Sequence, residues 1–354
     1  MFRVHPRVNS ILFTIMHFLV DGICGLVLFS TLLLNIDNQS KIIILLVYNC
    51  LAFVSQPIFG FLIDLGKNHE KYYLLGALIL IYLGVAFKYS SITSAILLGL
   101  GNSIFHISGG KYVIDKSDNS IIDLGIFVSS GALGLAIGCN FSYEWIWPTF
   151  LTPLAFIAMF VIMSEETTKI KKDKFKNIYD QLSANEVFLL LILICIAVLI
   201  RSYLGSAVNY KFEKTTLVLV LMGLASTLGK ALGGVIAKFI GINKTIIISM
   251  FISMLLLIFG NINVYASLIG IFFFNMSMPL TLYLANNVIK KQGFAFGLLA
   301  AFLVPGYLLG LIKLNDIAIK VMIALLSIAT ILIVITVNTI INKTRDHFKD
   351  KTYE

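Results

Sequence analysis

Five ionisable side chains lie inside apolar stretches of this 354-residue chain, where a charge is costly to hold. They are His17, Asp21, His106, Arg201 and Lys230. A charged side chain at the centre of a bilayer costs about 2.5 to 3.5 kcal/mol on insertion scales. Residues of these types inside a membrane helix commonly mark an ion pathway, a proton relay or a substrate site. The chemistry they offer is proton exchange and the binding of an anion.

The spacing of these residues places some of them together. His17 and Asp21 are four apart, so on a helix they share one face. Asp21 is central in its apolar stretch, and at ~1.5 Å per residue His106 lies about level with His17. Arg201 lies on the other side of the centre of its own stretch. This arrangement predicts one cluster of polar groups at mid-membrane depth.

A proton carrier needs a group whose protonated and deprotonated forms are close in free energy. Burial favours the neutral form of a carboxyl group, a neighbouring cation favours the charged form, and histidine titrates near neutrality. We hypothesise that Asp21 carries a coupling proton with His17 or His106 assisting. Arg201 would bind an anionic part of a substrate or compete for Asp21.

Each of these residues also has a purely structural interpretation. Asp21 and Arg201 could form a static ion pair, and His17 could stay neutral and hydrogen-bond Asp21. His106 could be a packed histidine that bonds a carbonyl group. Lys230 could extend to the membrane surface.

The elements that must position these residues are twelve apolar stretches. Hydrophobic residues make up 58% of the chain and charged residues 13%, and about 20 apolar residues span a bilayer as a helix. We predict an all-α membrane protein with transmembrane helices near residues 8–34, 41–63, 72–88, 92–113, 121–140, 145–163, 186–208, 215–238, 244–260, 264–289, 293–314 and 316–341.

Most Lys and Arg residues fall in segments on the same side as the N-terminus, which is the positive-inside pattern. Both termini and the basic loop 164–185 are therefore predicted to be cytoplasmic, in a multi-pass protein of the cytoplasmic membrane. The loop divides the chain into an N-terminal bundle, 1–163, and a C-terminal bundle, 186–354, of six helices each. The formal charge of +9 is explained by this asymmetry and needs no nucleic-acid partner.

A glycine pattern indicates that the two bundles are related repeats. The spacing of Gly125, Gly134 and Gly138 recurs at Gly297, Gly306 and Gly310. Two parallel repeats about an axis along the membrane normal would produce it. Small residues that let helices pack closely would explain each glycine taken singly.

Several motifs resemble those of the major facilitator superfamily. The run Gly60-Phe-Leu-Ile-Asp64-Leu-Gly66-Lys67 looks like its loop signature, in which the aspartate and basic residues help close the cytoplasmic side. That resemblance implies a gate at Gly60, Asp64 and Lys67. The spacing of the fifth-span glycines resembles the superfamily's antiporter motif, with Cys139 where proline is usual.

Within the superfamily, the chain looks most similar to fosmidomycin-resistance exporters. The similar residues are His17-Phe18 with Asp21, the run Gly99-Leu-Gly101-Asn102-Ser103-Ile-Phe105-His106, and Arg201-Ser202. Ile107 and Ser108 stand where that family has Pro-Glu. The resemblance implies two pseudo-symmetric bundles whose first, fourth, seventh and tenth helices line a central cavity. It adds Asn102 and Asn275 to the cavity residues.

These observations predict a secondary active transporter that moves a small polar or anionic solute or drug by alternating access. Proton-coupled efflux, by antiport, is the favoured function. A proton-coupled importer of a small metabolite with the same fold is the alternative. An enzyme is disfavoured because neither His-Glu-x-x-His nor Gly-x-Ser-x-Gly occurs. A channel would need a ring of repeated selectivity residues. The two halves carry unlike charges, so a channel is also disfavoured. We expect no cofactor and no metal, a small-molecule substrate, protons and membrane lipid as partners, and a monomer.

Overall fold

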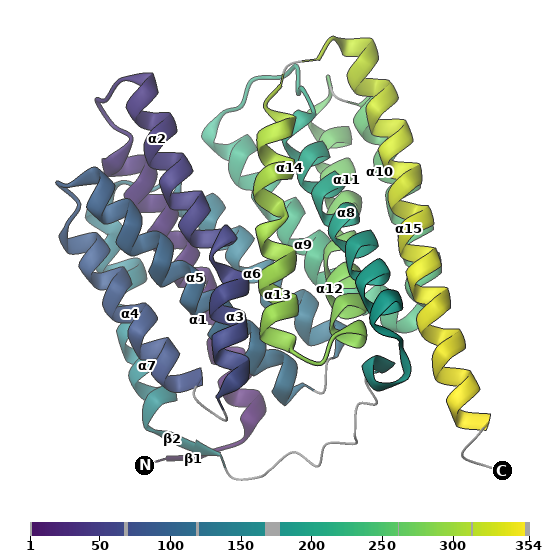
Figure 1. The fold of residues 1–354 in the computed structure, drawn as a ribbon. Coiled ribbons are helices and arrows are strands. Elements are labelled where there is room, and N and C mark those ends of the chain that lie inside the picture. The colour runs from purple at the N-terminus through teal and green to yellow at the C-terminus, as the bar shows by residue number, and fades with distance from the viewer. Residues whose placement is uncertain are drawn as a thin grey trace.

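The computed structural model describes residues 2–66, 70–117, 120–166, 178–260, 262–312 and 314–350. Lys67 of the predicted gate and most of the predicted linker lie outside these residues. The chain is folded almost entirely into helices that run roughly parallel to one another, with both chain ends at the same face (Figure 1). We call this face the terminus face.

The N-terminal half contains six spans. Their helices are α1 Pro6–Val27, α2 Asn38–Asn49 with α3 Gln56–Leu65, α4 Glu70–Ala86, α5 Ser91–Lys116, α6 Ile121–Gly138 and α7 Thr152–Met163. Short π-helical turns at Leu28–Leu32, Cys50–Val54 and Ile146–Leu151 extend α1, join α2 to α3 and precede α7. Strands β1 Phe2–Val4 and β2 Ser164–Glu166 pair in parallel at the terminus face, with Phe2 opposite Ser164.

The C-terminal half repeats this plan. A 3-10 turn at Ile178–Gln181 precedes it, and its helices are α8 Ala184–Ala207, α9 Thr216–Ile240, α10 Ile242–Phe259, α11 Val264–Asn275 with α12 Ser277–Val288, α13 Gln292–Ala301 with α14 Leu303–Gly310, and α15 Asp316–Asp350. A capping box starts α8, because the side chains of Ser183 and Glu186 each bind the backbone of the other.

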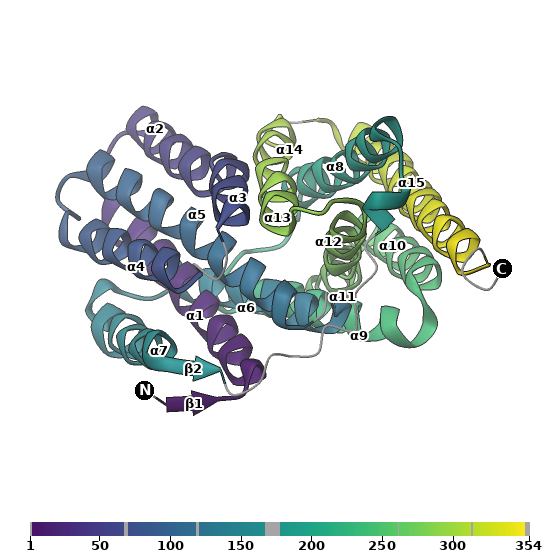
Figure 2. The ribbon, with the colours of Figure 1, turned by 60° about the horizontal axis from the view of Figure 1, so that its bottom comes forward.

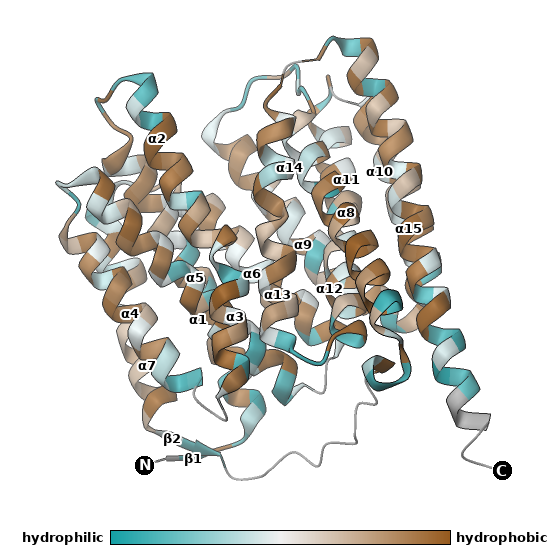
Figure 3. Cartoon of the chain, in the orientation of Figure 1, coloured by the Kyte–Doolittle hydropathy of each residue, from teal (hydrophilic) through white to brown (hydrophobic). Residues whose placement is uncertain are grey.

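Eleven segments of the described chain are long and apolar enough to cross a membrane. The twelfth predicted span corresponds to α4, whose 17 residues extend about 25 Å and fall at the short end of the range that can span a bilayer. Hydrophobic residues run along the helices and hydrophilic ones gather near their ends (Figure 3). Large apolar side chains such as Phe188 and Phe239 are exposed on the outer surface. The predicted all-α membrane fold is confirmed.

Several spans are broken near mid-depth, each with a proline just after the break. Pro57 is the second residue of α3, and Pro279 and Pro305 are the third residues of α12 and α14. Proline has no backbone N–H and its ring clashes with the carbonyl four residues earlier, so regular helix hydrogen bonding stops there. Phe53, Met278 and Leu303, which lie at or next to these breaks, line the same cavity as the predicted polar residues.

The two halves meet through two close helix pairs, α3 with α13 and α6 with α9 (Figure 2). Glycines make both approaches possible. A Cβ added to Gly60 would lie within 2.5 Å of the backbone carbon of Gly293. One added to Gly125 would lie 2.9 Å from the Lys230 carbonyl oxygen. These glycines lie toward the terminus face, so the halves are packed together there.

The remaining glycines of the repeat pack within each half. Gly134 and Gly138 leave no room for a side chain against the carbonyl groups of Phe18 and Gly22 on α1. Gly306 and Gly310 meet α8 in the same way, at Leu199 and Tyr203. Because both partner pairs are four residues apart, the fifth span packs on the first as the eleventh packs on the seventh. The repeat in the sequence is thus a repeat of packing.

Candidate functional site

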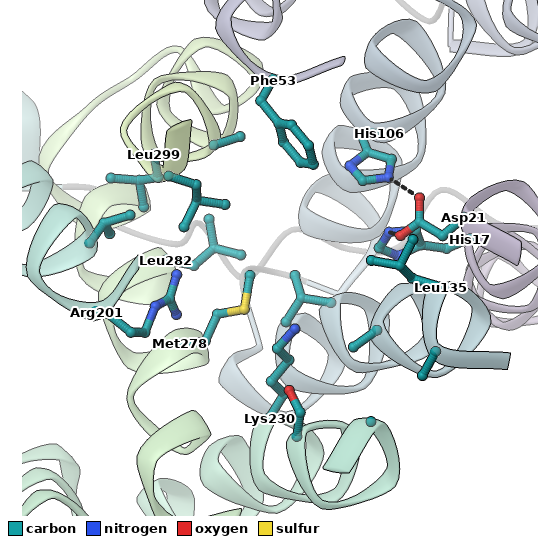
Figure 4. A pocket seen from close by; sticks show the side chains of 18 of the residues that line it. His17, Asp21, Phe53, His106, Leu135, Arg201, Lys230, Met278, Leu282 and Leu299 are labelled. Carbon is teal, nitrogen blue, oxygen red and sulfur yellow. Dashed lines mark hydrogen bonds and ion pairs between the residues drawn. The ribbon is translucent and has the colours of Figure 1, made fainter. Parts of the chain in front are cut away.

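A cavity of about 550 Å³ lies between the two halves and is lined by side chains from both. Five predicted residues face it, namely His17, Asp21, His106, Arg201 and Lys230. Figure 4 shows the first three on one wall and the two cations across from them. The rest of the lining is mainly apolar. The cavity extends to Asn140 just beyond α6 and to Leu219 in the first turn of α9, so it reaches toward the face opposite the termini.

Asp21 is the centre of the N-terminal wall. Its carboxylate oxygen Oδ1 lies 2.9 Å from His106 Nε2 and accepts a hydrogen bond of 3.0 Å from the side-chain amide of Asn102. The other oxygen, Oδ2, lies 3.4 Å from His17 Nε2. Asn102 is itself buried behind Asp21, and its amide also reaches the Tyr48 hydroxyl at 3.1 Å. The predicted N-terminal cluster is therefore brought together.

The hydrogen-bond partners of His17 determine which of its nitrogens carries a hydrogen. Nδ1 lies 2.8 Å from the backbone carbonyl oxygen of Phe127, which can only accept. Nδ1 must therefore donate, and in the neutral imidazole Nε2 then has a free lone pair. That lone pair faces Asp21 Oδ2, which is also an acceptor. The gap between these two atoms is the place where one proton fits.

His106 carries its hydrogen on the other ring nitrogen, Nε2. The side-chain nitrogen of Gln56 donates to the Ala52 carbonyl at 2.8 Å, which fixes the orientation of this amide, and the same nitrogen lies 3.5 Å from His106 Nδ1. Nδ1 then accepts a long hydrogen bond, and Nε2 donates to Asp21 Oδ1. The two histidine rings meet edge to face with centroids 4.5 Å apart.

The ligand atoms of His17, Asp21 and His106 all lie within 4.8 Å of one another, which is close enough for three residues to share a metal ion. Two features favour a proton over a divalent cation. His106 points a hydrogen, and not a lone pair, at Asp21. Arg201 and Lys230 also line this cavity and would repel a divalent ion.

The cations of the C-terminal wall are unpaired. In the described part of the chain, neither Arg201 nor Lys230 forms an ion pair or a hydrogen bond, and Nη1 of Arg201 is buried without an acceptor. Arg201 is only 8% exposed. A static Asp21–Arg201 pair is thus absent. A buried guanidinium that lacks an acceptor has hydrogen-bond donors available for an anion.

A second cavity of about 520 Å³ adjoins the first and shares Arg201 and Lys230 with it. Asn275 lines this second cavity and not the first, because it ends α11 at the break before α12. Its side-chain amide donates to the Ile271 carbonyl at 2.9 Å. The predicted cavity residues other than Asn102 thus line two cavities that share the two cations.

Gly131 of α6 also shapes the site and was not among the predicted residues. A Cβ at this position would collide with the Asp21 carboxylate and the His17 ring, so only glycine lets α6 pack against this pair. Gly131 lies between Gly125 and Gly134 of the glycine repeat. The missing signal was its place within one turn of Gly134, on the helix whose Phe127 carbonyl orients His17.

The predicted gate residue Asp64 contacts the other half. Its carboxylate accepts hydrogen bonds from the backbone N–H groups of Gly293 at 3.1 Å and Phe294 at 2.8 Å. Both residues lie in the first turn of α13. The unpaired N–H groups and dipole of a helix N-terminus favour an anion there. Lys111, from α5, lies 3.9 Å from the same carboxylate. A carboxylate of one half therefore caps a helix of the other.

No protein-family model and no curated protein matches the chain in sequence. Solved structures do match it. A crystal structure of FucP, a major facilitator superfamily transporter in the outward conformation, aligns over 93% of this chain and 98% of its own with a TM-score of 0.70 and 12% identity. The chain has the major facilitator fold. A crystal structure of the fucose:proton symporter FucP from Escherichia coli aligns over 94% and 99%, with a TM-score of 0.69 and 12% identity.

Proposed function

We propose that this protein is a proton-coupled secondary transporter that moves a small organic anion across the cytoplasmic membrane by alternating access. The observation that carries this proposal is the division of charge in one cavity. A carboxylate between two histidines lies on the wall of one half, and two cations without partners lie on the wall of the other. A carrier needs such a site between two halves that can part on either side.

The proton is assigned to the gap between His17 Nε2 and Asp21 Oδ2. A proton placed there turns two opposed acceptors into a hydrogen-bonded ion pair, and its loss leaves His17 neutral. The nearby His106 and Asn102 stabilise the carboxylate in either case. Histidine exchanges protons near neutral pH, so modest changes in the cavity can load or unload the site. Proton coupling is also what the name of the fucose:proton symporter states for that protein.

The anion is assigned to Arg201 and Lys230. The planar guanidinium of Arg201 can donate two parallel hydrogen bonds to a carboxylate, phosphate or phosphonate group. The apolar remainder of the lining would contact an uncharged body. A cavity of about 550 Å³ falls within the usual range for sites that hold small molecules.

Alternating access requires the two halves to separate at the terminus face. We propose that residues 1–163 and 186–354 move as two bodies joined by the linker 164–185, with the terminus face in the cytoplasm. The Asp64 hydrogen bonds to α13 and the glycine contacts of α3 and α6 would break during this motion. In this proposal, the contacts at the terminus face keep the cavity closed to the cytoplasm.

Export remains the direction that the glycine motif and the resemblance to fosmidomycin-resistance exporters favour, with import as the alternative. A thermal-shift screen of the purified protein against phosphonates, sugars, nucleosides and drugs would identify a ligand. Transport of that ligand into right-side-out and inverted vesicles, driven by a pH gradient, tests the proposal. We expect stabilisation by an anionic compound and gradient-dependent transport. Stabilisation only by neutral sugars or nucleosides, or transport indifferent to the gradient, would contradict it.

A further inference from the structure

We infer that the cavity binds its anion and its proton cooperatively, so that the two cross the membrane together and the protein is a symporter. This inference rests on the proposed function and deepens it by fixing the sign of the coupling. It replaces the export by antiport that the sequence favours with import, because a symporter moves its anion in the direction in which the protons flow. It is carried by the placement of one proton site and two unpaired cations in the same cavity.

The charges of the cavity set this sign. Among its described lining residues, Arg201 and Lys230 are cationic and Asp21 is anionic, and His17 faces Asp21 across the gap that takes the proton. With both histidines neutral, the two cations outweigh the carboxylate and the cavity has a formal charge of +1. A proton added between His17 and Asp21 raises this charge to +2. The protonated cavity therefore attracts an anion more strongly than the unprotonated one.

The converse holds by thermodynamic linkage. An anion bound at Arg201 and Lys230 offsets their positive field, and this field opposes the arrival of a proton at His17. Anion binding must therefore increase the proton affinity by the same factor by which the proton increases the anion affinity. A unit charge about 10 Å away at an effective dielectric constant of ~20 gives a factor on the order of tenfold.

The surroundings of the proton site contain no group that reverses this sign within the described residues. The titratable and charged groups that face His17 and Asp21 are His106 from α5, Tyr48 from α2, Cys24 from α1, Cys139 from α6, Lys230 from α9 and, across the cavity, Arg201 from α8. None of these groups is a carboxylate, so Asp21 is the only carboxylate among the described lining residues. An anionic substrate is then the one new negative charge that can enter.

Antiport would need the opposite coupling, in which the substrate and the proton exclude each other. A cationic substrate at Asp21 would compete with the proton in that way, but it would leave the Arg201 guanidinium without an acceptor. An anion satisfies that group and does not occupy the gap between His17 Nε2 and Asp21 Oδ2. Both ligands fit the cavity together, as symport requires.

Removal of either cation imitates anion binding and needs no identified ligand. The proton affinity of His17 can be measured by nitrogen NMR of the full-length protein in nanodiscs, labelled at histidine, with its signal assigned through His17→Gln. We expect Arg201→Gln and Lys230→Gln each to raise the proton affinity on the order of tenfold, which moves the titration midpoint up by about one pH unit. Arg201→Lys keeps the charge and should leave the midpoint near its wild-type position.

Lys238→Gln provides a matched control. Lys238 lies on α9 like Lys230 but is exposed near the terminus face, so its removal should not move the midpoint. Unchanged or lowered proton affinity in both Arg201→Gln and Lys230→Gln would overturn the inference. This outcome can be told apart from failure of the proposed function. A carrier whose two sites are not linked would still transport its ligand but would show no shift of the midpoint. A protein that is not a transporter could still show the shift but would transport nothing.

Discussion

The hydrogen on His17 is the residue-scale feature on which the account depends. Phe127 presents a carbonyl group to Nδ1, and Asp21 presents a carboxylate oxygen to Nε2, so both ring nitrogens face acceptors and a neutral ring has a hydrogen for only one of them. The His17 and Asp21 spacing was readable from the sequence, since residues four apart share a helix face. The Phe127 contact was not, because it joins residues 110 positions apart whose helices must first be packed.

The neutral form of His17 should be the tautomer with hydrogen on Nδ1. Long-range nitrogen–proton NMR of histidine-labelled protein at high pH distinguishes the two tautomers. We expect the Nδ1–H pattern for His17 and the Nε2–H pattern for His106, because Gln56 donates toward Nδ1 of His106. If His17 carried its hydrogen on Nε2, that hydrogen would already fill the gap to Asp21 and the proton site would be misassigned.

Gly131→Ala should damage the proton site although it removes no polar group. The added methyl group would overlap the Asp21 carboxylate and the His17 ring, which must then shift. Misplacement of reacting groups by about 1 Å can cost about a hundredfold in rate, so pH-gradient-driven transport should fall by at least tenfold. Gly76→Ala on α4 is the matched control, since an added Cβ there meets nothing within 4 Å. Equal transport by both variants would argue against close packing of α6 on the site.

At the scale of elements, the two helix pairs that join the halves are alike in packing but unlike in chemistry. Asp64 caps α13 across the α3–α13 interface. The run Gly60-Phe-Leu-Ile-Asp64 of α3 has its counterpart in Gly233-Gly-Val-Ile-Ala237 of α9, so Ala237 stands where Asp64 does in the other half. The resemblance to a gate motif singled out Asp64 from the sequence. It could not name its partners, which lie about 230 residues away in the other half.

Asp64→Asn should weaken closure at the terminus face. The change removes a charge that accepts two backbone N–H groups at a helix N-terminus, and charge-assisted hydrogen bonds contribute about 1.5 to 3 kcal/mol. We expect the population open at this face to increase at least tenfold, as measured by spin-label distances between α3 and α13. Asp37→Asn, at an exposed cap on the opposite face, should leave these distances unchanged. An unchanged distribution for Asp64→Asn would remove Asp64 from the gate.

At the scale of the whole molecule, the sequence was sufficient for the architecture because each apolar stretch is long enough to be recognised alone. The spans and their repeated glycines therefore anticipated the helices and the pseudo-symmetry. The broken helices were less visible, since Pro279 and Pro305 interrupt hydrogen bonding without interrupting the apolar run. The place of Asn275 in the second cavity alone, while Arg201 lines both, also depends on such a break, at the end of α11.

The two halves share a fold but carry different charges. The N-terminal half holds the proton site, and the C-terminal half holds the unpaired cations. A transporter built this way binds each ligand mainly with one half and brings them together only when both halves enclose the cavity. The central claim is therefore that Asp21 couples a proton to the movement of an anion.

Transport of the screened ligand by the Asp21→Asn variant in proteoliposomes tests this claim most directly. Asparagine keeps the shape of the side chain but cannot hold the charge that pairs with protonated His17. We predict that the variant folds, still exchanges ligand across the membrane, and loses accumulation driven by a pH gradient, while Asp37→Asn behaves as the wild type. Gradient-driven accumulation by Asp21→Asn at the wild-type level would contradict the account.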